Sequence, residues 1–390
     1  MTDAIELSLE QYIQRSWAVL LTYSEKTDVH MYLPHPFIAP SVLKRNGFAF
    51  QEQFYWDTYF TNVGLLDTGR VALAKGAVEN LLYLNDLLGY VPNSSKRRHS
   101  GRSQPPLLSS MVLDIFEHTK DLHWLERTYH AIVREYNKVW VSDEYPHSRN
   151  VYKGLSRYFN ADKTHRGAEK ESGWDYTSRF EDRALDFLPV DLNCFLFKYE
   201  YDLSFICHAL GMRTQEKEWA LQAEDRKKTI NELMWDEKSG LYFDYDYVNK
   251  RKGTVQSLAS YAPLFVGLAS EKQAKKLADN LPLFQTQHGL TITSKEAKAI
   301  SGKQWTAPNG WAPLHYIVTS GLDSYGFTEQ ATTIRRSWVK TVEDIYQKTG
   351  LIFEKYNMID PAQPPTSAVY PDQTGFGWTN AITAHYLKKR

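Results

Sequence analysis

The sequence predicts an all-α protein in which helical hairpins close into a toroid, as a single domain over residues 1–390. Two observations support this fold class. Apolar residues recur at helical spacing in about twelve segments, whereas strand-like stretches are short and directly follow helices. In addition, no Pro-, Gly- or Ser-rich linker divides the chain. Concentric pairs of helices are the simplest closed arrangement that buries so many apolar helix faces.

The helical segments follow one another with short connections. The first is amphipathic, since Ile13, Trp17 and Leu20 recur at helical spacing. The segment 28–55 is predicted to be irregular because it contains several prolines, and the polar segment 142–188 to be a long loop. Ser270 and Gln273 form a capping box for one helix. Helices are expected at 7–24, 59–69, 71–89, 107–119, 122–141, 189–211, 215–235, 255–268, 271–280, 311–320, 326–347 and 376–388.

A faint internal repeat supports the ring. The segment 239–246, Ser-Gly-Leu-Tyr-Phe-Asp-Tyr-Asp, resembles the start of 349–357, Thr-Gly-Leu-Ile-Phe-Glu-Lys-Tyr-Asn, and each follows a long predicted helix. Such a recurrence indicates stacked helical hairpins whose loops gather at one mouth; coincidence between two common turn sequences is the alternative. Asp244 and Glu354 occupy equivalent places in the two copies, so one of these carboxylates can be purely structural.

Composition argues against several classes of partner. Basic and acidic residues balance at 46 each, so there is no basic excess for nucleic acid or an anionic membrane. No window approaches 18 consecutive apolar residues, the length of a membrane-spanning helix. Cys194 and Cys207 lie in an apolar helical pattern and are predicted to be reduced core thiols. The first residues lack a basic region followed by an apolar run, so a cytoplasmic location is expected.

Two carboxylates are the candidates for chemistry. Asp175 lies between Trp174 and Tyr176, and a poorly solvated aromatic pocket raises a carboxyl pKa, as a proton donor requires. A buried structural Trp–Asp pair is the alternative. Glu354 is the second candidate, at the predicted mouth. In glycoside hydrolysis one acid protonates the leaving oxygen while the other acts as nucleophile or activates water, and the sequence leaves this choice open.

Further segments offer groups that suit a sugar. Trp56 can stack on a pyranose and Asp57 can accept hydrogen bonds from hydroxyls, although Asp57 could instead cap the following helix. Asn93, Arg102 and Gln104 can read vicinal hydroxyls with fixed donor geometry. The charge run at 96–99 is either a solvated loop or a rim that attracts an anionic substituent. The remaining aromatic candidates are Trp305, Trp311 and Trp378.

Taken in order, these segments resemble the trehalase family, glycoside hydrolase family 37, from about residue 30 to residue 390. The resemblance implies an (α/α)6 barrel and inverting hydrolysis of an α-glucoside, with no cofactor and no metal. It implies that Asp175 is the general acid and that Glu354 is the general base that activates water. The matching pieces are Tyr55-Trp56-Asp57-Thr58-Tyr59-Phe60, Arg102-Ser103-Gln104-Pro105-Pro106, Ser172-Gly173-Trp174-Asp175, Leu188-Pro189-Val190-Asp191-Leu192-Asn193, Pro308-Asn309-Gly310-Trp311-Ala312-Pro313, Glu354-Lys355-Tyr356 and Gly375-Phe376-Gly377-Trp378-Thr379-Asn380.

The resemblance also assigns binding residues. Those that would grip the glucose being cleaved are Trp56, Asp57, Asn93 and Arg102. Those that would line the rest of the site are Gln104, Gly173, Trp174, Trp305, Trp311 and Trp378.

The chain departs from the family pattern around the leaving group. Ala49 stands where the family has Arg, and Thr306 where it has Asp. The Gly-rich lid is replaced by the proline-rich segment 358–371, with Val369 in place of a Glu. The segment before Asp175 is short, so that only Arg166 and Glu169 are loose candidates for another Arg and Glu. We therefore expect a retained glucose pocket and an altered leaving-group pocket.

Three functions follow. The leading prediction is hydrolysis of trehalose to glucose. The second is hydrolysis of another small glucoside, such as glucosylglycerate or mannosylglycerate, as in the similar glycoside hydrolase family 63. The third is a sugar-binding scaffold without activity. In each case the partner is a small sugar, and the sequence leaves open the oligomeric state and whether 358–371 acts as a lid.

Overall fold

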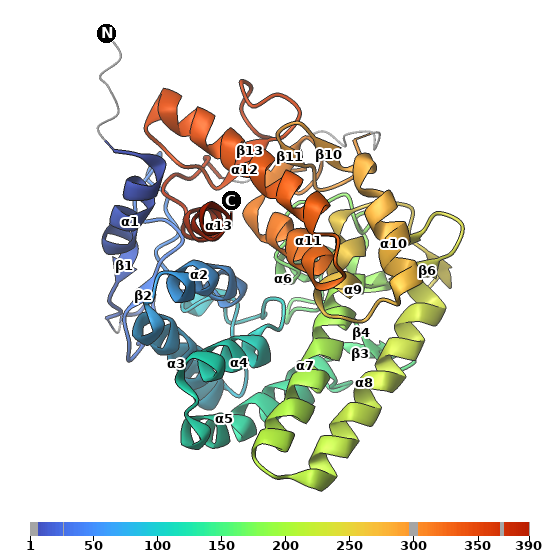
Figure 1. Ribbon diagram of the computed structural model, residues 1–390. Helices are drawn as coiled ribbons and strands as arrows, with labels where there is room; N and C mark the ends of the chain where they lie inside the picture. The colour runs from blue at the N-terminus through green and yellow to red at the C-terminus, as the bar shows by residue number, and fades with distance from the viewer. Residues whose placement is uncertain (1–6, 26, 296–302, 367–369, 390) are drawn as a thin grey trace.

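The computed structural model describes residues 7–25, 27–295, 303–366 and 370–389. In this part of the chain, helices alternate between an outer and an inner ring (Figure 1). Each inner helix contacts the next, and the last contacts the first, which closes the ring. The inner helices are α2 (Tyr55–Asp67), α4 (Leu108–Thr119), α7 (Val190–Ala209), α9 (Ala262–Phe265), α11 (Ala312–Ser324) and α13 (Gly377–Lys388). The outer helices are α1 (Leu9–Leu20), α3 (Val71–Leu88), α5 (Leu122–Glu135), α8 (Arg213–Met234), α10 (Glu271–Asp279) and α12 (Thr328–Thr349).

This arrangement confirms the predicted all-α, (α/α)6 toroid. The inner helices are buried on nearly all sides, and small residues let their backbones approach. A Cβ atom added to Gly64 of α2 would lie 2.5 Å from the Cα of Ala381 in α13. A Cβ atom added to Gly321 of α11 would lie 2.7 Å from the Cβ of Leu264 in α9. Residues larger than glycine at these two crossings would push neighbouring inner helices apart.

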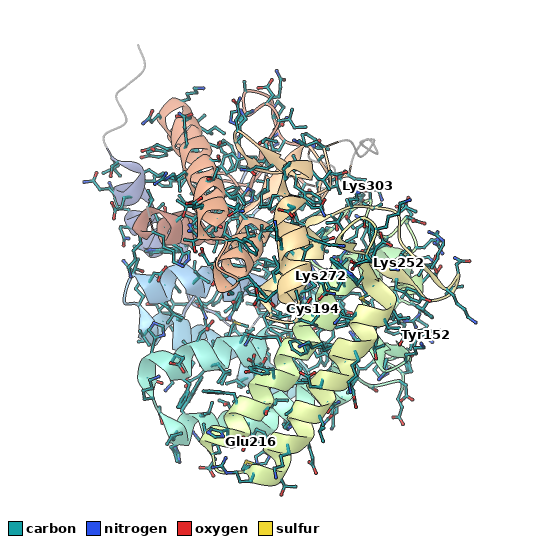
Figure 2. The ribbon with its side chains drawn as sticks, turned by 45° about the vertical axis from the view of Figure 1, so that its right-hand side comes forward. Tyr152, Cys194, Glu216, Lys252, Lys272 and Lys303 are labelled. Atoms are coloured by element: carbon teal, nitrogen blue, oxygen red, sulfur yellow. The ribbon has the colours of Figure 1, made fainter. Side chains whose placement is uncertain are left out.

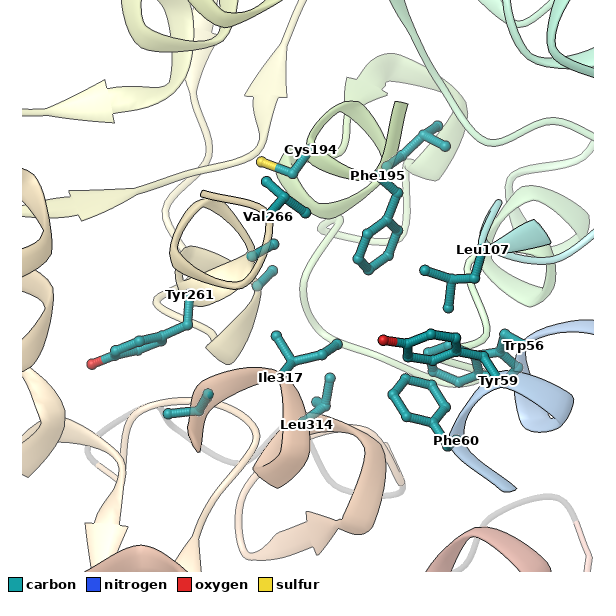
Figure 3. Packing of buried hydrophobic residues seen from close by; sticks show 14 of the residues in the cluster. Trp56, Tyr59, Phe60, Leu107, Cys194, Phe195, Tyr261, Val266, Leu314 and Ile317 are labelled. Carbon is teal, nitrogen blue, oxygen red and sulfur yellow. The ribbon is translucent and has the colours of Figure 1, made fainter. Parts of the chain in front are cut away.

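Side chains from several inner helices fill the middle of the ring. Figure 3 shows Trp56 and Phe60 of α2 facing Leu314 and Ile317 of α11, with Phe195 of α7 beside them. All of these side chains are buried. The ring therefore encloses a packed core rather than a channel.

Local capping signals begin or end several of the outer helices. Ser270 accepts a hydrogen bond from the backbone N–H of Gln273, and the Gln273 side chain accepts one from the backbone N–H of Ser270, which confirms the predicted capping box. The helix α12 ends at Gly350, whose φ of 69° suits a left-handed cap. The tip of the α7–α8 hairpin, marked by Glu216 in Figure 2, lies far from Lys303.

Short strands and turns connect the helices, and one pairing shapes the site. Strands β12 (Asn309–Trp311) and β13 (Lys355–Asn357) are antiparallel, with Trp311 opposite Lys355. The other strands are β1 (Leu21–Thr22), β2 (Phe37–Ile38), β3 (Asn150–Tyr152), β4 (Leu155–Ser156), β5 (Phe187–Leu188), β6 (Trp235–Asp236), β7 (Leu241–Tyr242), β8 (Tyr245–Asp246), β9 (Arg251–Lys252), β10 (Gln285–Thr286) and β11 (Gly289–Leu290). The 3-10 turns are Arg97–His99, Ala184–Asp186, Leu258–Tyr261 and Leu281–Leu283, and Tyr136–Trp140 is a π-turn.

Two local predictions were wrong. The helix expected at 255–268 is instead an extended residue, Ser257, a 3-10 turn and the single turn α9. Pro263 explains the break, because proline has no N–H and is accommodated only in the first turn of a helix. The loop expected at 142–188 contains strands and a further helix, α6 (His165–Glu171), capped by Thr164.

The cysteine prediction was correct. Cys194 and Cys207 are buried and free, and Figure 3 shows Cys194 pointing toward Val266 in the core. Among the residues that the structure describes, no helix combines the length and the apolar character needed to cross a membrane.

Candidate active site

One cavity at the mouth of the ring gathers the predicted site residues. It is lined by every one of them except Trp174. Trp56 and Asp57 lie in the first turn of α2, and Trp378 lies in the first turn of α13. The β12–β13 pairing holds Trp311 beside the strand that follows Glu354. The members are Trp56, Asp57, Asn93, Arg102, Gln104, Gly173, Asp175, Trp305, Trp311, Glu354 and Trp378.

Asp175 follows α6 after a tight turn. Gly173 has a φ of +77°, and a Cβ atom there would lie 2.6 Å from the Trp56 ring, so only glycine fits. Asp175 itself is partly exposed to the cavity. Burial raises the pKa of Asp175 to about 6, while the positive charge of Arg102 opposes this rise. The side chain therefore keeps its proton at mildly acidic pH, as a general acid must.

Glu354 precedes strand β13 and is held in place by hydrogen bonds to its backbone carbonyl and to its carboxylate. Its carbonyl oxygen accepts hydrogen bonds from the Trp378 indole and the Thr379 hydroxyl, both at 3.3 Å. Its carboxylate accepts one from the Tyr370 hydroxyl at 2.9 Å and one from Lys355 Nζ at 3.0 Å. Burial raises the pKa of Glu354, and the Lys355 charge opposes this. The lysine thus favours the ionised form that a general base needs.

Asp57 is a third carboxyl group in the same cavity. Burial raises its pKa well above the usual range, and the charges of Glu354 and then Asp175 raise it further. The N-cap of α2 is Phe54, so the alternative in which Asp57 caps this helix is wrong. A carboxyl group that holds its proton to higher pH can donate a hydrogen bond to a sugar hydroxyl.

Tryptophan rings form one wall of the cavity. Trp305 and Trp311 are stacked, with ring centroids 3.8 Å apart and an interplanar angle of 9°. The Trp378 ring stands at 75° to Trp311, with 5.9 Å between centroids. Flat indole faces inclined steeply to each other suit the apolar faces and edges of a pyranose.

The prediction that Trp174 lines the site was wrong. Its ring is 1% exposed and lies behind Trp305, with 5.7 Å between centroids. The Arg179 guanidinium also lies over this ring, 4.6 Å from its centroid. Trp174 therefore supports the tryptophan wall from behind. The sequence alone does not reveal whether an aromatic residue next to a catalytic candidate lines the cavity or lies behind its wall.

A buried ion cluster anchors the segment after Asp175. Arg179 donates two hydrogen bonds to Asp191 and two to Asp244, each of 2.7 Å. Asp244 also accepts one from the backbone N–H of Val190, at the start of α7. Asp244 is therefore the structural member of the two equivalent carboxylates, whereas Glu354 faces the cavity.

The polar wall is held together by hydrogen bonds. The Gln104 side-chain oxygen accepts one from the Trp56 backbone N–H at 3.1 Å, and Arg102 lies 3.4 Å from the Asn93 oxygen. Glu171, which the sequence did not single out, accepts one from the Ser103 backbone N–H at 2.7 Å. It also pairs with buried Arg149. Glu171 thus ties the Arg102–Gln104 segment to the segment that carries Asp175.

Sequence reasoning missed the aromatic rim of the cavity. Tyr370, inside the proline-rich segment, stacks on Phe48 with 5.6 Å between centroids and an interplanar angle of 16°. Phe48 and Phe50 alternate with Ala49 in the sequence, and this pattern could have predicted an aromatic rim. Val369 lies outside the described residues. The rim consists of Phe48, Phe50, Phe54, Tyr370 and Phe376.

Arg166 and Glu169, the loose candidates for the leaving-group side, do not line this cavity. They pair with each other and line a separate hollow together with Tyr176 and Lys303. In the charge run, Lys96 pairs with Glu52, and both line the cavity.

A closed (α/α)6 ring whose mouth holds acidic side chains among tryptophans defines a glycoside hydrolase. The sequence model of the trehalase family matches residues 7–168 and 156–390. The chain therefore belongs to the trehalase family.

The chain is also similar to one protein in sequence and to two solved structures in fold. A periplasmic trehalase from Pseudomonas aeruginosa is 29% identical over 426 aligned residues, covering 97% of this chain and 76% of that protein. A neutral trehalase from Saccharomyces cerevisiae has a similar fold, with a TM-score of 0.81 at 24% identity over 99% of this chain and 80% of the other. A family 63 mannosylglycerate hydrolase from Thermus thermophilus, solved with glucose, reaches 0.73 at 16% identity over 98% of this chain and 100% of the other.

Proposed function

We propose that the protein hydrolyses α,α-trehalose to two glucose molecules with inversion at the cleaved carbon. The supporting observation is that Asp175 and Glu354, far apart in sequence, line one cavity with the tryptophan wall. The family assignment and the names of its relatives point to the same substrate.

The side chains support a single-displacement reaction. Asp175 donates its proton to the glycosidic oxygen as the bond from that oxygen to the anomeric carbon breaks. Glu354 accepts a proton from a water molecule, whose oxygen attacks the same carbon from the opposite face. Asp57 and Arg102 hold the glucose through its hydroxyls. The reaction leaves Asp175 ionised and Glu354 protonated, and proton exchange with solvent resets both.

The stereochemistry provides the test. Inverting hydrolysis of α,α-trehalose yields one β-glucose from the cleaved unit and one α-glucose from the leaving unit. Proton NMR in the first minutes, before mutarotation, should show the two anomers in equal amounts. Release of α-glucose alone would contradict inversion, and absence of glucose would contradict the substrate.

A variant of the general acid distinguishes an enzyme from a sugar-binding scaffold without activity. In an enzyme, Asp175→Asn should lower kcat by about 10²- to 10⁴-fold, as expected for loss of a general acid, while sugar binding measured by calorimetry persists. If the wild-type protein binds α-glucosides and hydrolyses none, it is a scaffold. The cytoplasmic location is likewise a proposal that cell fractionation tests.

A further inference from the structure

Four cationic side chains line the active-site cavity: Lys96, Arg98, Arg102 and Lys170. Lys96 is paired with Glu52, and Arg102 lies within reach of Asn93. Among the residues that the structure describes, the side chains of exposed Arg98 and half-buried Lys170 make no direct hydrogen bond or ion pair. These two cations at the cavity wall are therefore free to contact a ligand, although the Lys170 charge also acts on Asp175.

The position of these two cations indicates which part of the substrate they face. Lys170 lies in the last turn of α6, just before the turn that carries Asp175. Arg98 lies in the 3-10 turn Arg97–His99 at the rim of the cavity, where the His99 ring lies 6.0 Å from the ring of Phe54. Because a general acid must face the leaving oxygen, groups beside Asp175 lie on the leaving-group side.

The cavity wall carries four carboxyl groups and four cations of Lys and Arg, but two of these carboxyl groups are already paired. Glu52 is already paired with Lys96. Glu354 is paired with Lys355, which leaves Asp57 and Asp175 to face Arg98, Arg102 and Lys170. His99 adds little positive charge, since burial and then the Arg102 charge lower its pKa to about 4. Three cations thus face two carboxyl groups, and an anionic leaving unit would supply the missing negative charge, whereas a neutral sugar would not.

We propose that Arg98 and Lys170 form an anion subsite for the leaving unit. The preferred substrates are then α-glucosides whose leaving unit carries a carboxylate or a phosphate, and trehalose is the neutral member of the range. The inference rests on the proposed glucoside hydrolysis and names the class of its leaving group. It also fits the finding that Arg166 and Glu169, the sequence candidates for contacts to the leaving unit, line a separate hollow, so that other residues must contact this unit.

The test uses pairs of substrates that differ only in charge. Glucosylglycerate and glucosylglycerol share the same glucosidic bond and differ by a carboxylate in place of a hydroxymethyl group. Trehalose 6-phosphate and trehalose form the second pair, which separates phosphate from carboxylate. The ratio of kcat/KM, anionic over neutral, should be about tenfold or more in at least one pair, as expected for charge-assisted hydrogen bonds.

Variants then assign this ratio to the two residues. Arg98→Gln combined with Lys170→Gln should bring the ratio close to one. Arg97→Gln removes a neighbouring exposed cation that does not line the cavity and should preserve the ratio. A wild-type ratio near one in both pairs, or a ratio that the double variant retains, would overturn the anion subsite.

Binding separates this inference from the proposed reaction. Calorimetry of both pairs on Asp175→Asn measures charge preference without turnover. A preference for the anionic member that disappears with Arg98→Gln and Lys170→Gln supports the subsite even if no glucoside is hydrolysed. Equal dissociation constants within each pair would overturn it even in an active trehalase.

Discussion

At the scale of single residues, the pKa of Asp175 sets where the enzyme can work. The general acid must carry a proton, and burial raises the pKa of Asp175 to about 6. We therefore expect kcat/KM for trehalose to fall as pH rises through this value, roughly tenfold for each further pH unit. Rates measured from mildly acidic to mildly alkaline pH test this. A profile that stays flat to alkaline pH would exclude Asp175 as the proton donor.

Tyr370 is expected to position and tune the base. Its hydroxyl donates a hydrogen bond to Glu354, and after burial and the Lys355 charge this bond acts to lower the pKa of Glu354. In Tyr370→Phe the pKa of Glu354 should rise, so that the base becomes protonated at higher pH. The acidic limb of the kcat profile should move to higher pH, with a loss of roughly five- to tenfold below it.

The phenylalanine keeps the ring that stacks on Phe48, so the change isolates the hydroxyl. Tyr325→Phe removes another hydroxyl with a hydrogen bond, to the Ala269 carbonyl, and serves as a control that should leave the limb in place. An unmoved acidic limb in Tyr370→Phe would show that this hydroxyl does not act on the base.

The sequence predicted which residues lie near the site better than it predicted where their side chains point. The sequence placed Asp175 and Glu354 in one cavity because the matching segments carry both. It could not show that Trp174 faces Arg179 and the back of Trp305, since neighbouring aromatics look alike in one dimension. Nor could it show which residue of a charge run is already paired, as Lys96 is with Glu52.

At the scale of elements, long periodic helices were predictable and short ones were not. The α12 helix has both a clear apolar stripe and a Gly cap, and its prediction at 326–347 was close to Thr328–Thr349. The helix α9 is a single turn, too short to show helical periodicity of apolar residues in the sequence, although it forms part of the inner ring. The helix α6 is likewise short and polar, and tertiary contacts rather than propensity stabilise it.

The crossing of α2 and α13 is expected to be sensitive to one methyl group. In Gly64→Ala the new Cβ would lie 2.5 Å from backbone of Ala381, so the helices must separate. We expect a loss of about 1–3 kcal/mol in the free energy of unfolding, measured by urea denaturation. Gly101→Ala is a matched control, because its nearest atom would lie 3.7 Å away, an ordinary contact. Equal stabilities for the two variants would show that the crossing can relax.

At the scale of the whole molecule, closure of the ring should make unfolding cooperative. In an open stack of helical hairpins each unit contacts only its neighbours, so the ends can unfold separately. Here α13 contacts α1, α2, α11 and α12, which joins the two ends of the ring. The single domain over residues 1–390 stays a prediction, and this closure supports it more directly than sequence composition does.

We therefore expect one unfolding transition for the entire chain. Loss of helical circular dichroism and the change in tryptophan fluorescence should share a midpoint, because the tryptophans of the cavity lie where both ends of the ring meet. Gly64→Ala should lower both midpoints together, although α8 lies across the ring from the substituted crossing. Two separated midpoints, or a variant that shifts only one of them, would show that the ring divides into independent domains. A cavity built from both halves would then lose its geometry as soon as the weaker half unfolded, and activity would disappear before most of the helix did.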